Sequence, residues 1–295
     1  MVTYSRFGGP DVLELVDAPP PRPDPGQILV SVRAAGVNPT DWRAREGQFR
    51  RIRPTRFPAG VGQDAAGVVR AVGPGVRDVE IGDAVFGRGF STYAEQAVLF
   101  AWARLPDRLS FAEAAGYPSV TETALRILGE VAVPAGETLL VSGAAGGVGT
   151  AVVQIARHRG IVVVGTASAA NQDYLRGLGA YAVTYDPGWV DRVRAIGPVH
   201  AALDISGSGV LPDLLALTGD RHRVVTIADL DAPLLGIRFS GVGGDMTAAL
   251  AETVDLVERG VLTIPVAQSY PLAAAAAAHA DSSTGHTRGR RVIVP

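Results

Sequence analysis

The sequence predicts an α/β protein of two domains, a β-rich barrel-like domain followed by a doubly wound parallel sheet. Its 295 residues correspond to about two domains of ordinary size. Up to about residue 115, short apolar runs alternate with glycine and proline, whereas from about residue 120 strand-like and helix-like runs alternate. A glycine-rich turn at 143–149 follows the first strand of the second part. These three observations define the expected fold class.

The first part reads as short strands separated by turn residues. Five prolines between residues 19 and 25 keep that segment extended and exclude a helix interior, so it is expected to be a loop between strands. The expected strands are 28–34, 65–72, 83–86 and 93–99.

The second part shows the alternation of a βαβ protein, which favours a parallel sheet covered by helices. The expected strands are 138–142, 161–165, 182–185, 201–205 and 223–227. The expected helices are 147–158, 172–178, 211–217 and 247–258. The alanine-rich tail from about residue 266 is expected to form a helix at 272–280 and a last strand at 291–294.

Composition excludes several classes of function. Twenty-seven basic and 29 acidic residues give a net charge of −2, so we expect no nucleic-acid partner and no anionic membrane surface. Every basic residue is arginine, which excludes a Schiff-base lysine and a P-loop lysine. The chain has no cysteine, which excludes disulfides, thiolate nucleophiles and zinc sites that need sulfur. No secretory leader or run of about 18 apolar residues is apparent, so a cytoplasmic location is expected.

The turn at 143–149 has the composition of a phosphate-binding loop. Glycine allows a tight turn and lets a pyrophosphate approach the backbone amides, and the positive end of the following helix attracts the anion. The expected cofactor-binding residues of this turn are Ala145, Gly146, Gly147 and Val148. The alternative is that the glycines only form a tight turn between strand and helix.

The segment after the second strand distinguishes between the two nicotinamide cofactors. A carboxylate there would bind a ribose 2′-hydroxyl and repel a 2′-phosphate, but residues 166–171 contain no acid. Ser168 and Asn171 can donate hydrogen bonds to a phosphate, so the sequence favours NADP(H). Alternatively, Ser168 caps the next helix.

Four segments together resemble the medium-chain dehydrogenase/reductase superfamily, and within it the zinc-free quinone oxidoreductase (zeta-crystallin-like) branch. They are Ala-Gly-Val-Asn-Pro-Thr-Asp at 35–41, Gly-Gln-Asp-Ala-Ala-Gly-Val-Val at 62–69, Gly-Asp-Ala-Val-Phe-Gly at 82–87 and Ala-Ala-Gly-Gly-Val-Gly at 144–149. The resemblance implies a GroES-like catalytic domain at 1–118, completed by 266–295, and a Rossmann NADP(H)-binding domain at 119–265. It also implies a cofactor in the cleft between the domains, a small-molecule substrate and a homodimer.

Two departures from the zinc-dependent relatives indicate chemistry without a metal. Asn38 stands where those enzymes carry a cysteine ligand, and Gln63-Asp64 stands where they carry His-Glu. The histidines at 158, 200, 222, 279 and 286 show no spacing typical of a metal site. The resemblance therefore implies a metal-free reductase that transfers hydride to a quinone or an α,β-unsaturated carbonyl.

The resemblance also assigns candidate catalytic residues. Asn38 matches an asparagine near the nicotinamide ribose, although a loop asparagine before Pro39 can instead form an Asx-turn. Asp41 can orient polar groups or relay a proton, or it can cap a helix. Trp42 stands where relatives often carry tyrosine and would form an apolar wall. Thr123 matches a threonine on a helix that faces the nicotinamide.

Further candidates are expected to line the cofactor. Tyr185 matches a residue beside the adenosine phosphate, and Ile227 and Ala228 match residues at the nicotinamide end of the cofactor. The alternative for each of the three is that its side chain only packs within the sheet. Tyr117 can supply a phenol or pack in the core. The arginines at 43, 45, 50, 51, 53 and 56 form either a solvated loop or a rim that attracts an anion.

Two rival functions stay open on the sequence alone. An enoyl-thioester reductase would need a basic site for a nucleotide or phosphopantetheine group, for which the arginine run is a candidate. A non-catalytic NADPH-binding protein would use the same fold without turnover.

Overall fold

The computed structural model describes residues 1–51, 54–241, 243–285 and 287–295. Arg53 and His286, which the sequence analysis named, lie outside the described residues. Contacts divide the chain into two units. Unit 1 comprises Met1–Ser119, Asp245–Arg259 and Ile264–Pro295, and unit 2 comprises Val120–Gly244 and Gly260–Thr263. Helix α8 (Met246–Glu258) belongs to unit 1, although its sequence lies within the range expected for the second domain.

Unit 1 is built around a small antiparallel barrel. Strand β3 (Ile28–Gly36) pairs with β5 (Asp64–Val72) on one side and β7 (Gln96–Arg104) on the other, while β6 (Ala84–Phe90) joins β5 to β7. The four strands therefore close on themselves, and apolar side chains fill the interior. The mixed α/β class and the barrel-like first part are confirmed.

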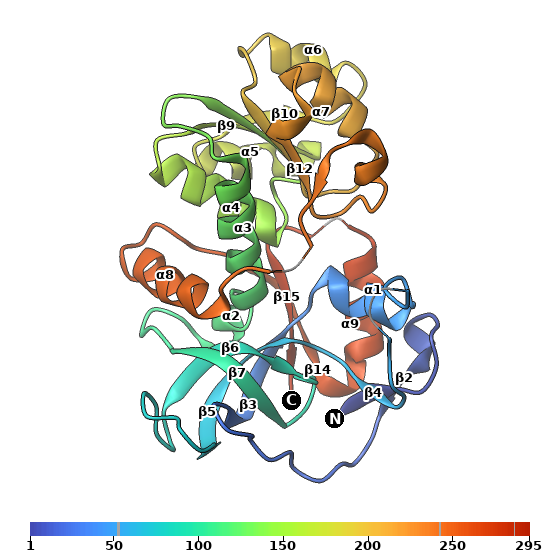
Figure 1. The fold of residues 1–295 in the computed structure, drawn as a ribbon, viewed down its shortest axis with the longest axis vertical. Helices are drawn as coiled ribbons and strands as arrows, with labels where there is room; N and C mark the ends of the chain where they lie inside the picture. Colours follow the sequence, from blue (N-terminus) through green and yellow to red (C-terminus); the bar gives the residue numbers. More distant parts are fainter. Residues whose placement is uncertain (52–53, 242, 286) are drawn as a thin grey trace. The chain divides into compact units, whose positions relative to one another are not determined.

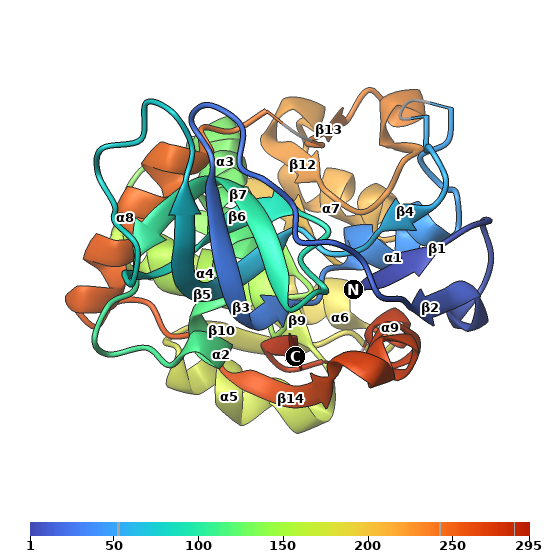
Figure 2. The ribbon, with the colours of Figure 1, turned by 90° about the horizontal axis from the view of Figure 1, so that it is seen from below.

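The C-terminal tail extends this sheet. Strand β15 (Arg290–Val294) pairs antiparallel with the end of β3, and β14 (Val266–Pro271) pairs parallel with β15. Figure 2 shows this last segment in red beside the blue N-terminal strands. The pairing brings residues about 250 positions apart in sequence into one neighbourhood, next to the loop that follows β3.

Smaller elements complete unit 1. The short strands β1 (Val2–Tyr4), β2 (Leu13–Leu15) and β4 (Ala59–Gly60) form a separate three-stranded sheet. Helix α9 (Ala275–Ser283) packs against α1 (Pro39–Arg45), and α8 packs against β7. The remaining short helices are η1 (Pro10–Val12), α2 (Phe111–Ala114) and η5 (Leu272–Ala274).

Unit 2 contains a six-stranded parallel sheet with the order β10-β9-β8-β11-β12-β13. Figure 1 labels β9, β10 and β12 of this sheet. Its strands are β8 (Thr138–Ser142), β9 (Val162–Ala167), β10 (Tyr181–Thr184), β11 (Ala201–Asp204), β12 (Val224–Thr226) and β13 (Arg238–Phe239). The chain runs outward from β8 to β10 and then returns to β11, so the strand order reverses between β8 and β11. Ligands of such sheets bind beyond the carboxyl ends of the strands at this switch point.

Helices connect the parallel strands and cover the sheet. Helix α4 (Gly147–His158) turns Val152, Ile155 and neighbouring apolar side chains inward, and α7 (Leu211–Thr218) packs on β11 and β12. The other helices are α5 (Gln172–Gly177), α6 (Trp189–Arg194), η2 (Ala169–Asn171), η3 (Arg221–Arg223) and η4 (Ala232–Leu235). Helix α3 (Pro118–Val131) lies mostly in unit 2. Within the part of the chain that the structure describes, no helix is long and apolar enough to cross a membrane.

The expected strands exist, but some of their ends differ. The expected strand at 93–99 is wrong at its start, because β7 begins at Gln96 and continues to Arg104. Tyr93 lies in a bend instead, where its ring is fully buried and its hydroxyl bonds to Asp41. The hydrogen bond to Asp41 holds Tyr93 in this bend, outside the strand that its apolar neighbours predict.

Candidate functional site

The glycine-rich loop begins at the carboxyl end of β8, beside the switch point of the unit 2 sheet. Gly146 is the N-cap of α4 and carries no side chain over the end of the helix. Gly147 and Val148 occupy the first turn, where amide groups have no acceptor within the helix and are free to bind an anion. Ala145 is buried at the base of the loop.

Two further glycines shape this loop. Gly143 has a φ of +81°, a left-handed conformation that side chains disfavour. A Cβ on Gly149 would lie 2.3 Å from the carbonyl oxygen of Gly143, so only glycine permits this approach of helix to loop. A Cβ on Gly146, in contrast, would meet only that carbonyl, at 3.6 Å. The loop is thus tightly packed at Gly149 and leaves open space at Gly146, where a pyrophosphate could approach the backbone.

Polar side chains gather where β8, β11 and β12 end. Asp204 Oδ2 accepts a hydrogen bond from Thr226 Oγ1 (2.8 Å), and its Oδ1 accepts bonds from the amides of Ser206 (3.2 Å) and Gly207 (3.0 Å). The hydroxyls of Ser142 and Ser206 are hydrogen-bonded at 2.8 Å. This network fixes the loop after β11 against the start of the glycine-rich loop.

The residues expected to select the cofactor follow β9 and β10. Ser168 is the N-cap of η2, but its hydroxyl makes no capping bond and accepts one from Asn171 Nδ2 (3.1 Å). Ser168 and Asn171 are therefore brought together, with no acid in residues 166–171. Tyr185 lies just past the end of β10 with 51% of its surface exposed, so it does not pack in the sheet.

Three other candidates in unit 2 have defined places. Ile227 and Ala228 follow the carboxyl end of β12, where Ala228 N donates to Thr226 Oγ1 (3.1 Å). Thr123 lies half-buried on α3, and its hydroxyl donates to the Glu122 carboxylate at 3.3 Å. Glu122 also pairs with Arg126 at 2.7 Å.

Unit 1 contains a second polar centre, the Asn38 cluster, which we define as Asn38, Asp41, Asp64, Tyr93 and Arg290. Asn38 Nδ2 donates to Asp64 Oδ2 (2.9 Å), and Asn38 Oδ1 accepts from Arg290 Nη2 (2.8 Å). Arg290 Nη2 lies 3.8 Å from the same oxygen of Asp64. Ser119 Oγ donates to the other Asp64 oxygen at 2.6 Å. Both ends of the Asn38 carboxamide thus belong to a buried network.

Asp41 occupies the third position of α1 and bonds back to the start of the helix. Its Oδ2 accepts from the Asn38 amide (2.8 Å) and from the Tyr93 hydroxyl (3.1 Å). The alternative of Asp41 as the N-cap is wrong, because Asn38 is the N-cap and Asp41 closes the capping box from inside the helix.

Burial changes the protonation of this cluster. Desolvation raises the pKa of Asp41 from 3.8 to about 7, although the hydrogen bond from the Asn38 amide opposes the rise. The charge of Asp64 raises this pKa further, whereas the Tyr93 hydroxyl and Arg290 lower it. Burial also raises the pKa of Tyr93 well above its ordinary value. The Asp41 carboxyl can therefore gain or lose a proton near neutral pH.

Other named side chains of unit 1 have mainly structural surroundings. Trp42 is half-buried on α1, and its indole nitrogen has no hydrogen-bond partner within the described structure. Tyr117 is buried, and its hydroxyl accepts from the amide of Ile264 (3.1 Å). His279 is fully buried against the ring of Tyr93, with centroids 5.7 Å apart. Among the described residues, no group of three His, Cys, Asp or Glu could hold a metal ion.

Sequence reasoning missed several members of these networks. Arg290 and Tyr93 join the Asn38 cluster from segments 252 and 52 positions away from their partners, and Ser119 bonds to Asp64 from 55 positions away. No local sequence pattern predicts contacts between residues so far apart in the chain. Asp204 is the exception, because an acid at the end of an expected strand could have been recognised as a residue at the ligand-binding edge of the sheet.

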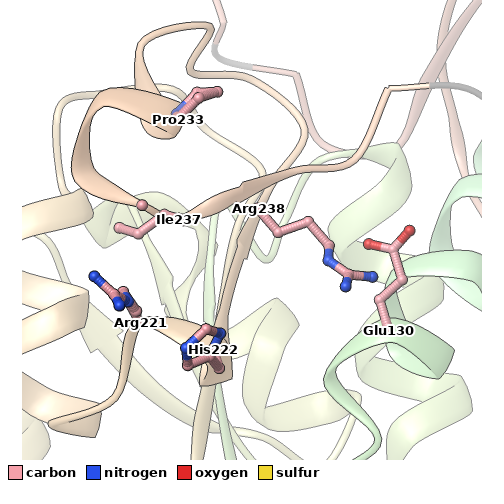
Figure 3. A pocket seen from close by; sticks show the side chains of 7 residues that line it. Glu130, Arg221, His222, Pro233, Ile237 and Arg238 are labelled. Carbon is pink, nitrogen blue, oxygen red and sulfur yellow. The ribbon is translucent and has the colours of Figure 1, made fainter.

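A hollow of about 470 Å³ in unit 2 lies elsewhere, at the amino ends of β12 and β13 (Figure 3). Its lining residues are Glu130, Arg221, His222, Pro233, Gly236, Ile237 and Arg238. Figure 3 shows the guanidinium of Arg238 extending toward the carboxylate of Glu130. Because the glycine-rich loop lies at the carboxyl ends of the strands, this hollow is not part of the dinucleotide site.

Comparisons with known proteins agree with this architecture. Residues 24–104 match the alcohol dehydrogenase GroES-like domain, and residues 178–293 match the zinc-binding dehydrogenase family model. The quinone oxidoreductase of Sus scrofa is 32% identical over 315 residues, which cover 96% of this chain and 93% of that protein. The structure of Escherichia coli quinone oxidoreductase complexed with NADPH has a TM-score of 0.89 and 27% identity, covering 100% of this chain and 99% of the other.

A further relative is much longer than this chain. The pikromycin polyketide synthase component PikAII of Streptomyces venezuelae is 44% identical over 158 residues, which are 52% of this chain and 4% of that protein.

The barrel, the parallel sheet and the matched models place the chain in the medium-chain dehydrogenase/reductase superfamily. Within that superfamily, it belongs to the quinone oxidoreductase family.

Proposed function

We propose that the protein is a metal-free, NADPH-dependent oxidoreductase that transfers hydride to a quinone or an α,β-unsaturated carbonyl compound. The observation that carries the proposal is the open glycine-rich loop at 143–149, followed after β9 by a segment with no acid. Membership of the quinone oxidoreductase family, and the NADPH complex of the Escherichia coli relative, support it.

The residues of unit 2 fit such a cofactor. The amides of Gly147 and Val148 would bind the pyrophosphate, with Ala145 and Gly146 forming the floor of the loop. Ser168 and Asn171 would bind the 2′-phosphate, because neither carries a negative charge that would repel it. We assign Tyr185 to the adenosine side and Ile227, Ala228 and Thr123 to the nicotinamide side. When bound, NADPH supplies the hydride.

The composition of the candidate site supports a reaction that needs no metal. The chain contains no cysteine, and Asn38 lies between the charged groups of Arg290 and Asp64 instead of beside further metal ligands. A quinone or an enone spreads the charge that develops on hydride addition onto a distant oxygen, which hydrogen-bond donors can stabilise. A simple ketone lacks this delocalisation and depends more on a Lewis acid.

The Asn38 cluster is the proposed catalytic centre of unit 1. Its buried amide and carboxyl groups are fixed by hydrogen bonds, so they can orient a bound group without reorganising. We assign Asn38 to anchoring the bound group and Asp41 to holding a proton near neutral pH. Trp42 would form an apolar wall, and Thr123 would face the nicotinamide.

The test is the loss of NADPH absorbance by purified protein in the presence of EDTA, with a benzoquinone, a naphthoquinone, a linear enone and an enoyl thioester as acceptors. Turnover of a quinone or the enone, with a clear preference for NADPH over NADH, is the expected result. Turnover of the enoyl thioester alone would favour that rival acceptor class. Saturable NADPH binding with no turnover of any acceptor would favour a binding protein and contradict the proposal.

The proposal has three further parts that rest on the resemblance. Residues 1–118 with 266–295 form the catalytic domain, and residues 119–265 form the nucleotide-binding domain. Helix α8 lies in the second range but packs on β7 of unit 1. The protein acts as a homodimer. It functions in the cytoplasm on a small-molecule substrate.

A further inference from the structure

We propose that Arg290 is a positioning residue that fixes the orientation of the Asn38 carboxamide and balances the charge of the Asp64 carboxylate. Its effect on turnover rests on the proposed function, whereas its effect on the cluster itself can be measured without turnover. Arg290 is the first residue of the last strand, β15, and lies 252 positions from Asn38.

The contacts define which way the Asn38 amide points. Its oxygen accepts from Arg290 Nη2 at 2.8 Å, and its nitrogen donates to Asp64 Oδ2 at 2.9 Å. A flipped amide would place its NH2 group against the guanidinium and its oxygen against the carboxylate. Both contacts would then be repulsive, so the two charges select one orientation.

The backbone around Arg290 leaves room for this side chain. A Cβ on Gly36 would lie 3.0 Å from Arg290 Nη2 and 2.3 Å from the carbonyl oxygen of Ala115. A Cβ on Gly116 would lie 3.1 Å from Arg290 Cγ. The arginine therefore runs between two glycines at the ends of different segments, and larger residues there would displace it.

Arg290 and Asp64 are both buried, so each charge is stabilised by the other. Arg290 is 5% exposed and Asp64 is not exposed at all, so removal of Arg290 leaves the Asp64 carboxylate buried with hydrogen bonds from Asn38 and Ser119 but without its cation. The Nε of Arg290 has no hydrogen-bond partner within the described residues, and Nη2 makes the contacts to Asn38 and Asp64. Burial lowers the pKa of Arg290, while the charges of Asp64, Asp41 and Tyr93 raise it.

Loss of this cation has two consequences. Without it, the Asn38 oxygen loses its donor, and only the bond from Asn38 Nδ2 to Asp64 still fixes the orientation of the amide. In addition, the pKa of Asp41 rises above about 7, because the positive charge of Arg290 lowers that pKa. The charged groups that face Asp41 are Asp64 and Arg290, and Tyr93 is its titratable hydrogen-bond donor.

The experiment compares Arg290→Met, Arg290→Lys and Arg290→Met/Asp64→Asn with a matched control, Arg291→Met. Arg291 is the next residue of the strand and pairs with Asp281, outside the Asn38 cluster. For each protein, kcat, KM, the NADPH dissociation constant and the unfolding midpoint are measured from pH 5 to 9. Fluorescence titration gives the dissociation constant.

Arg290→Met should lower kcat about tenfold or more and move the pH profile upward. Arg290→Lys should recover part of kcat, and the double variant should have a higher unfolding midpoint than Arg290→Met. Arg291→Met should keep the wild-type kcat and pH profile. Equal losses of kcat in Arg290→Met and Arg291→Met would overturn the proposal.

The unfolding data keep the two proposals separate. If the wild-type protein reduces no acceptor, the proposed function fails, but the comparison of Arg290→Met with the double variant still tests the coupling to Asp64. A double variant that is no more stable than Arg290→Met would overturn the role of Arg290. Should Arg290→Met fail to fold, Arg290→Lys carries the same test through its pH profile and midpoint.

Discussion

The raised pKa of Asp41 predicts a specific pH dependence of folding stability. The pKa of this carboxyl is 3.8 in an ordinary environment and about 7 in the folded protein, mainly because of burial. The folded state therefore binds the proton more tightly than the unfolded state. The resulting stabilisation is fully present below pH 3.8 and is lost as the pH rises toward 7.

The magnitude follows from the size of the shift. About three pKa units at 1.36 kcal/mol each correspond to about 4 kcal/mol, or roughly 1.4 kcal/mol per pH unit within this window. Asp41→Asn keeps an oxygen that can accept from the Asn38 amide and the Tyr93 hydroxyl, but it cannot titrate. The stability difference, wild type minus Asp41→Asn, should therefore fall by about 4 kcal/mol between pH 4 and pH 8.

The assay is urea unfolding followed by tryptophan fluorescence at several pH values. Both proteins carry Trp189→Phe, which removes the indole of α6 in unit 2 and leaves Trp42 and Trp102 as reporters of unit 1. Tyr93→Phe provides a second variant: it removes a bond that lowers the pKa of Asp41, so the titration should move to higher pH. A stability difference that stays constant or increases with pH would show that the pKa of Asp41 is not raised by folding.

Three further predictions concern other parts of the molecule. Gly149→Ala places a Cβ 2.3 Å from the Gly143 carbonyl oxygen and should weaken NADPH binding at least about tenfold in a fluorescence titration, whereas Gly129→Ala, with nothing within 4 Å of the new Cβ, should bind normally. Burial lowers the pKa of His279 from 6.5 to about 3, so its protonation favours the unfolded state as the pH falls from 6.5 toward 3. His279→Gln should therefore lose less thermal stability than the wild type over this pH range, and an equal loss in both proteins would contradict the prediction. Ser168→Asp adds a negative charge after β9 and should raise KM for NADPH at least about tenfold with little effect on NADH; parallel effects on both cofactors would argue against a 2′-phosphate site there.

The fold was predictable where local patterns determine it. The glycines at 143–149 impose a turn between an apolar strand and a helix, and this turn lies at the switch point of the observed sheet. Helix α3, however, begins at Pro118 and was not among the helices expected from periodicity. Only the resemblance placed Thr123 on a helix.

The Asn38 cluster shows why a site can be predicted only in part. The segment at 35–41 identified Asn38 and Asp41, but the partners that determine their chemistry come from β5, the bend before β7 and the start of β15. The last strand was expected at 291–294, one residue after its true start, so Arg290 was left out. Its importance depends on the pairing of β15 with the end of β3, which brings the last strand beside the segment at 35–41.

Deuterium transfer from NADPH that carries two deuterium atoms at C4 of the nicotinamide is the decisive measurement of hydride transfer. The EDTA-treated protein is incubated with the labelled cofactor and a linear enone, and the product is analysed by mass spectrometry and NMR. We expect one deuterium at the β-carbon of the saturated product for each NADPH oxidised. Oxidation of NADPH without deuterium in the product, or activity that disappears with EDTA and returns with zinc, would contradict it.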